Sequence, residues 1–331
     1  MLKASNHQVA GHEASEGKLG PVVDNSGRFY KPLQSGERGL KEVAFYESLS
    51  SNKTIPNHIR SYFPKFYGTK LLEVSNGSAM HPHLILEDLN SAQLDPSIMD
   101  IKMGCRTWPP ESSEDYVQKC LQRDRGSTSL PIGFRISGLE VFGSEESGLW
   151  KPDKKYIKSL SVDDVRLVLR KFVSSNACAD PSVSPDCSLA SVVYGGPNGI
   201  LAQLLELKAW FEEQTLFHFY SCSVLFMYEK GSGSEGKNFN AKVKLIDFAH
   251  VLDGCGVIDH NFLGSRFAEN IIEISLVIVS SITFTANVFN HSMRSSVFSF
   301  CDFYFSLSTI PVPVKAVSSR SLDCNGKNHW L

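Results

Sequence analysis

The stretch PSIMDIKMG, residues 96–104, decides how the rest of this chain is interpreted. It is an apolar run that opens with a proline and closes with a glycine, and Asp100 stands two positions before Lys102. In a β-strand, residues two apart project to the same face, so the pattern places both charges on one side of a strand. Either they form a buried ion pair, which rarely adds much stability, or both face a ligand that carries hydroxyls and phosphates. The stretch by itself favours neither alternative.

The composition is that of a soluble globular protein. The chain has 331 residues, 42% of them hydrophobic and 21% charged, which is enough for one large domain or two modest lobes. The formal net charge of -2 gives no global basic field, so we expect no nucleic-acid contact, and an anionic ligand needs a local cluster of cations. The eight cysteines show no metal-binding spacing, and the polar N-terminus is unlike a signal peptide. We therefore expect the cysteines to be reduced thiols and the protein to be located in the nucleus and cytoplasm.

The segments before residue 96 predict a small α+β lobe. Residues 18–33 read as a hairpin around Asp24-Asn25-Ser26-Gly27, which is good turn chemistry. Residues 37–50 have apolar positions at helical spacing, HLILED at 83–88 reads as a strand, and a polar joint follows at 89–95. We therefore predict a nucleotide-covering lobe with its hinge at 1–90, a larger lobe at 91–264, and a separate tail at 265–331.

The larger lobe is expected to mix helices and strands. We predict a helix at 113–125 with Ser113 or Ser112 as its N-cap, a pair of strands within 132–142, and a capped helix at 161–173. The clearest amphipathic helix spans 200–217, and strands follow at 221–229 and 243–251.

Two further charged patterns suggest nucleotide chemistry. Lys31 lies on the early hairpin and Glu42 in the next helix, which is how kinases clamp nucleotide phosphates, although a solvated lysine is the commoner fate. In KLIDFAHV, Asp247 ends an apolar run and precedes Phe248, as in kinase metal sites, although chance Asp-Phe pairs are common. His250 follows three residues later, and its usual role would be a satisfied core or surface histidine.

The helix at 113–125 carries a basic face. Tyr116, Lys119, Cys120 and Arg123 fall at i, i+3, i+4 and i+7 and so share one side. Two cations one turn apart repel each other unless an anion lies between them. The alternative is a solvated face that Asp115 and Asp124 balance.

The order of these features is that of a kinase. A strand lysine, a helix glutamate, a hinge, Asp-x-Lys, a basic helix and Ile-Asp-Phe follow one another along the chain. The motifs H-R-D-L-x-x-x-N and G-x-G-x-x-G of protein kinases are absent from the sequence, which argues against peptide substrates.

PSIMDIKMG resembles the P-x-x-x-D-x-K-x-G signature of the inositol polyphosphate kinase family, and the plant multikinases within it are the most similar class. SCSVLFMYE (221–229) is similar to the family's Ser-Ser-Leu-Leu segment, from which Cys222 and Val224 depart, and KLIDFAHV is similar to its metal-binding strand. HQVAGH, GFRISG and DHNFLG (259–264) also resemble the family. The resemblance runs from about residue 1 to Gly264.

The resemblance implies an α+β, two-lobed, ATP-grasp or kinase-like fold and the ATP- and Mg2+-dependent phosphorylation of inositol trisphosphate to tetrakis- and pentakisphosphate. For the nucleotide it implies Lys31 with Glu42 at the ATP phosphates, an adenine hinge of Glu87, Asp88 and Leu89, and Mg2+ on Asp247. For catalysis and substrate it implies Asp100 between ribose and inositol, Lys102 at the transferred or inositol phosphates, and Lys119, Arg123 and His250 at substrate phosphates. A monomer is expected.

The tail departs from this pattern. Nine of residues 265–331 are charged, Ser265 stands where the family has a glycine, and Pro311 and Pro313 interrupt any late helix. We expect it to pack poorly. Residues 271–289 are the one membrane candidate, but they contain Glu273 and several Ser and Thr, so no stable insertion is expected. The tail keeps open a catalytically impaired isoform that acts as a binding or regulatory protein, and a kinase of another class is a third alternative.

Overall fold

The computed structural model describes residues 2–4, 7, 9, 20–73, 80–91, 93–144, 147–229 and 240–262. All of them belong to one compact unit that spans Met1–Thr285. The predicted tail at 265–331, with the membrane candidate at 271–289, lies outside the described residues. Among the helices that are described, none is both long and apolar enough to cross a membrane.

The segments before residue 88 form an antiparallel sheet with the strand order β1-β2-β3-β5-β4. Its strands are β1 (Lys3–Ala4), β2 (Val22–Val23), β3 (Arg28–Pro32), β4 (Phe66–Glu73) and β5 (Met80–Glu87). The predicted hairpin is β2–β3, and Asp24 Oδ1 closes its turn by accepting from the backbone N–H groups of Ser26 and Arg28. Helices α1 (Glu37–Ser51) and α2 (Asn57–Arg60) follow the hairpin. β4, the edge strand, was not among the predicted elements.

The second sheet has the order β11-β10-β6-β7-β8, and all its neighbours are antiparallel. Its strands are β6 (Pro96–Met103), β7 (Phe134–Phe142), β8 (Leu149–Trp150), β10 (Ser223–Glu229) and β11 (Lys242–Ile246). The opening stretch is therefore its central strand, β6, and seven of its eight residues are buried. Gly104 ends the strand with φ +95°, a conformation that side chains rarely adopt. The predicted strand from Pro96 to Gly104 is confirmed.

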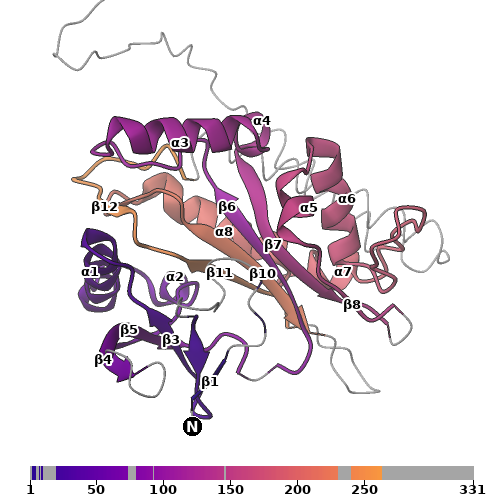
Figure 1. Cartoon of the computed structure of the whole chain (residues 1–331), viewed down its shortest axis with the longest axis horizontal. Helices are drawn as coiled ribbons and strands as arrows, with labels where there is room; N and C mark the ends of the chain where they lie inside the picture. The colour runs from indigo at the N-terminus through magenta and orange to yellow at the C-terminus, as the bar shows by residue number, and fades with distance from the viewer. Residues whose placement is uncertain are drawn as a thin grey trace, which may run out of the picture. The chain divides into compact units, whose positions relative to one another are not determined.

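Helices pack along the second sheet, as Figure 1 shows for α5 and α6 beside β7 and β8. The helices are α3 (Glu114–Arg125), α4 (Ser129–Ile132), α5 (Lys154–Lys158), α6 (Val162–Phe172), α7 (Ala190–Val193) and α8 (Ile200–Glu213). The predicted cap of α6 is present as a capping box, in which Ser161 Oγ accepts from the Asp164 N–H and Asp164 accepts from the Ser161 N–H. Helices combined with antiparallel sheets confirm the α+β class.

Several predicted boundaries are wrong. The pair of strands predicted within 132–142 is a single strand, β7 (Phe134–Phe142), because Ile132 ends α4 and Gly133 at φ +73° turns the chain directly into β7. Helix α8 ends at Glu213, since the Gln214 side chain bonds the backbone of Leu216 and Phe217 and starts strand β9 (Phe217–Phe219). The strand predicted at 243–251 breaks after Ile246, and β12 (Val251–Asp253) pairs with β9. Ser113 occupies the N-cap of α3 but makes no side-chain cap hydrogen bond.

An aromatic cluster joins α1 to the segments around β9 and β11. The Phe45 ring of α1 lies 4.2 Å from Phe248, 5.1 Å from Phe217, 5.8 Å from Phe219 and 5.9 Å from Phe63, measured between ring centroids. All five rings are buried. Aromatic pairs in this range add to the stability that burial alone provides. The cluster holds the buried face of α1 against the residues that follow β11.

Candidate active site

The ammonium of Lys31, on β3, lies between two carboxylates. Its Nζ is 2.7 Å from Glu42 Oε1 and 2.7 Å from Asp247 Oδ1. Burial alone lowers the pKa of Lys31, but the charges of Asp247 and Glu42 outweigh it and raise the pKa above its ordinary value, so the ammonium stays charged. One cation and two anions leave an excess of one negative charge at this point. The predicted pairing of a strand lysine with a helix glutamate is present.

Backbone geometry and aromatic packing hold Asp247 in place. It follows β11 and has φ +68°, a left-handed conformation that Asp tolerates better than most residues, at a cost of about 1 kcal/mol. The next residue, Phe248, is fully buried against Phe45, and its N–H donates to Glu42 Oε1 at 3.3 Å. Glu42, with no exposed surface, therefore binds both Lys31 and the backbone beside Asp247.

Asp100 and Lys102 project from the same side of β6. Asp100 is 4% exposed, and burial together with the negative charge of Asp247 raises its pKa to about 6, although Lys102 opposes the shift. Asp100 Oδ1 has no hydrogen-bond partner among the described residues. The buried ion pair considered above, in which Lys102 would satisfy this oxygen, is therefore not formed. Asp100 lies near enough to Asp247 for the two carboxylates to interact electrostatically.

Three cations surround His250. Burial, and after it the positive charges of Arg38, Lys102 and Lys41, together lower the pKa of His250 to about 4 against the opposing charge of Glu111. The imidazole is therefore neutral at pH 7. Lys41 is tied to Glu111 at 3.1 Å.

Arg38 and Lys41 were not among the predicted site residues. Both residues lie on α1: Arg38 is four positions before Glu42, and Lys41 is one position before it. Residues four positions apart on a helix lie on the same face. Had Glu42 been taken as facing a site, this spacing would have placed Arg38 beside it.

One end of the predicted basic face of α3 meets His250. The Tyr116 ring stacks on the His250 ring with centroids 6.0 Å apart, and its hydroxyl lies 3.5 Å from His250 Nε2. The Arg38 guanidinium lies 5.2 Å from the centroid of the same Tyr116 ring. Tyr116 thereby joins α3 to α1 at the histidine.

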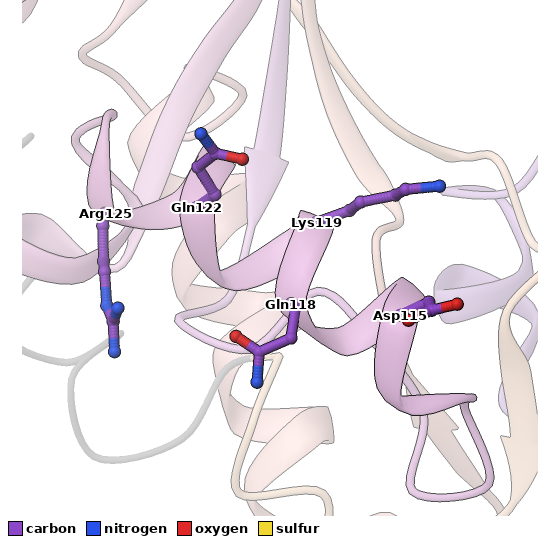
Figure 2. A pocket seen from close by; sticks show the side chains of 5 residues that line it. All are labelled: Asp115, Gln118, Lys119, Gln122 and Arg125. Carbon is purple, nitrogen blue, oxygen red and sulfur yellow. The ribbon is translucent and has the colours of Figure 1, made fainter.

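The two predicted substrate cations of α3 have different surroundings. Arg123 Nη2 donates to Thr107 Oγ1 at 2.6 Å, and its Nε lies 3.3 Å from Asp124 Oδ1, so part of its charge is already neutralised. Lys119 is exposed and lines a surface pocket of about 560 Å³ on the outer side of α3. Figure 2 shows the described side chains around this pocket, which are Asp115, Gln118, Lys119, Gln122 and Arg125. The substrate-binding roles of Lys119 and Arg123 stay predictions.

The predicted adenine hinge connects the two sheets. Glu87 ends β5, and the N–H of Asp88 donates to Gly27 O at 3.0 Å, while Asp88 Oδ1 accepts from the Asn90 N–H. The Leu89 N–H has no partner in the part of the chain that is described. Leu89 is therefore the hinge residue whose backbone donor is open to a base, and the adenine role of the three residues stays a prediction.

Comparisons with known proteins agree with this architecture. The family model described as inositol polyphosphate kinase matches residues 83–274. The chain is 54% identical over 283 residues to an Arabidopsis thaliana protein, inositol polyphosphate multikinase beta, and the match covers 82% of this chain and 94% of the relative. The family match continues ten residues past Gly264, where the resemblance noted in the sequence ends, and the prediction of a separate tail at 265–331 stays a prediction.

Solved structures show the same fold. A structure of an inositol phosphate multikinase is 52% identical, with a TM-score of 0.59 over 70% of this chain and 99% of the solved one. A Saccharomyces cerevisiae inositol phosphate multikinase, solved with ADP and Mn2+, has a TM-score of 0.55 at 19% identity and covers 75% of this chain and 98% of its own.

Proposed function

This chain belongs to the inositol polyphosphate kinase family, and we propose that it transfers the terminal phosphoryl group of ATP to hydroxyls of inositol trisphosphate, giving tetrakis- and then pentakisphosphate. The observation that carries this proposal is the position of Lys31, whose Nζ lies 2.7 Å from carboxylate oxygens of both Glu42 and Asp247, although Asp247 is 216 residues away along the chain. Phosphoryl transfer requires positioned charge more than covalent chemistry, and this constellation supplies it.

The donors around Lys31 fit a magnesium ion that nucleotide phosphates share. Asp247 offers a carboxylate that is 39% exposed, and Glu42 Oε2 is buried without a hydrogen-bond partner in the described residues. The described part of the chain holds no cluster of three or more His, Cys, Asp or Glu side chains that could bind a metal by themselves. Mg2+ characteristically takes one or two protein carboxylates and completes its shell with phosphates and water. When bound, the ion would neutralise charge on the ATP phosphates, with Asp247 as its ligand.

The charges around His250 suit a strongly anionic acceptor. Arg38, Lys41 and Lys102 gather there from two elements, although the net charge of the whole chain is only -2. A neutral imidazole can donate or accept a hydrogen bond without adding a charge that would have to be desolvated. These groups can hold acceptor phosphates while Asp100, on the same sheet, orients the reacting hydroxyl.

The test is direct turnover by the purified full chain. Inositol trisphosphate, ATP and Mg2+ are incubated with the protein, and the inositol products are resolved by anion-exchange chromatography while ADP is measured in parallel. We expect tetrakisphosphate first, pentakisphosphate later, and one ADP for each phosphate gained. ADP release without a phosphorylated inositol product would overturn the proposal, and phosphorylation of a control peptide instead would favour a kinase of another class.

A further inference from the structure

Two polar oxygens are buried without partners beside each other in the second sheet. Among the described residues, neither Asp100 Oδ1 nor Ser223 Oγ has a hydrogen-bond partner, and Ser223 has no exposed surface. Native proteins pair nearly all such atoms, because an unpaired buried polar group forfeits its hydration without compensation. This pair therefore requires a physical explanation.

The strand register places the two side chains on the same face. β10 runs antiparallel to β6 with Ser223 opposite Lys102 and Leu225 opposite Asp100. Residues directly opposite in a sheet share a face, and a diagonal step to the next residue on that face remains within reach of side chains. Ser223 is thus one diagonal step from Asp100. Ser223 is also among the groups that lower the pKa of Asp100 against its burial.

We propose that Ser223 is a positioning residue whose hydroxyl donates a hydrogen bond to Asp100 Oδ1 and so aims the other carboxylate oxygen, Oδ2, at the hydroxyl-bearing ligand. This inference rests on the proposed function. A ligand has no access to Ser223 Oγ, because the residue is completely buried. Ser223 acts only through Asp100, which has no other described partner for Oδ1 to restrain rotation of its carboxylate. A small rotation of the two side chains pairs both orphaned atoms at once.

A double-mutant cycle separates this role from a general packing role. Ser223→Ala, Asp100→Asn and the double variant are compared with the wild type in kcat/KM for inositol trisphosphate. We expect Ser223→Ala to lose about 10- to 100-fold, the range that follows from misplacing a group near the reacting atoms. In the Asp100→Asn background the same substitution should change kcat/KM by less than about 2-fold, because the residue through which Ser223 acts is already altered. If the double variant loses kcat/KM by the product of the two single-variant losses, the proposal is overturned.

Two variants control for stability and for the hydroxyl itself. Ser97→Ala removes another buried serine hydroxyl, on β6, which already accepts from the Phe142 N–H at 3.1 Å, and it should lower the melting temperature without changing kcat/KM. Ser223→Thr keeps the hydroxyl and should recover at least part of the activity that Ser223→Ala loses. A Ser97→Ala variant as impaired as Ser223→Ala, or a Ser223→Thr variant no better than Ser223→Ala, would contradict the positioning role.

The same cycle measured by urea unfolding without ligands keeps this inference apart from the proposed function. If the changes in unfolding free energy caused by Ser223→Ala and Asp100→Asn are not additive, the hydrogen bond is present whether or not the protein is active. A wild type that phosphorylates no inositol phosphate would overturn the proposed function alone. Additive unfolding free energies would overturn the hydrogen bond. If the two substitutions are coupled in unfolding free energy but their losses in kcat/KM multiply, the hydrogen bond exists and the positioning role is overturned.

Discussion

Glu42→Gln should disable the enzyme with only a modest loss of stability. The substitution keeps the size of the side chain and an oxygen that can accept from Lys31 Nζ and from the Phe248 N–H, but it removes one of the two negative charges beside Lys31. Asp247 then neutralises Lys31 by itself, and the excess negative charge that suits a metal is lost.

The magnitude follows from the contacts. The bond from Lys31 to Glu42 is charge-assisted on both sides, and a neutral amide makes a bond about half as strong, so we expect a loss of about 1–2 kcal/mol. A full loss of 3–5 kcal/mol, typical of breaking a buried ion pair, is not expected because Asp247 still pairs with Lys31. In domains of about 150–250 residues, this loss corresponds to a fall in melting temperature of about 2–8 °C.

The effect on turnover should be larger. If Lys31 shifts toward Asp247 by even about 1 Å, kcat should fall on the order of 10²-fold. Steady-state kinetics, calorimetric titration with ADP and thermal unfolding measure the three consequences. Glu47→Gln is the matched control, because Glu47 lies on the same helix and is exposed. If Glu42→Gln kept wild-type kcat and ADP affinity, the clamp between α1 and β3 would have no role in nucleotide binding.

Four further results are expected. Asp247→Asn should lower kcat by on the order of 10²-fold or more and leave the protein folded, since Asn also tolerates φ +68°; a wild-type rate would exclude the metal role. Lys102→Ala should act mainly on kcat, and Lys119→Ala on the KM for inositol trisphosphate, with an unchanged KM refuting the assignment of Lys119. An ionised carboxylate accepts a hydrogen bond from the reacting hydroxyl more strongly than a protonated carboxyl group does, and the pKa of Asp100 is raised to about 6. We therefore expect kcat/KM to fall as the pH drops below 6, whereas an unperturbed carboxyl would act down to about pH 4. The pKa of His250 is lowered to about 4, so the unfolded chain takes up this proton first, and stability should fall between about pH 6.5 and 4 in the wild type but less in His250→Gln by urea unfolding.

Local pattern was enough to predict the elements that carry the site. The strand that holds Asp100 and Lys102 begins at Pro96 and ends before Gly104 as the sequence indicates, because a proline and a glycine limit a strand through their own backbones. The helix of Glu42 and the hairpin of Lys31 were likewise predictable from helical spacing and turn chemistry, which act over a few residues. The prediction was wrong at the end of β11, where Phe248 packs against the distant Phe45, and at the end of α8, where the Gln214 side chain binds the backbone of Leu216 and Phe217.

The sequence by itself therefore determined which charged residues stand on which strands and helices, and in what order. Only the tertiary structure decided which of them meet. Lys31 reaches Asp247 because Phe45 and Phe248 pack together and because Asp247 turns the chain at φ +68°, and neither feature has a signal in local sequence. Arg38 approaches His250, and Ser223 stands beside Asp100, for the same kind of reason. Periodicity specifies the face of an element, whereas the partner of that face depends on strand register and core packing between segments far apart in the chain.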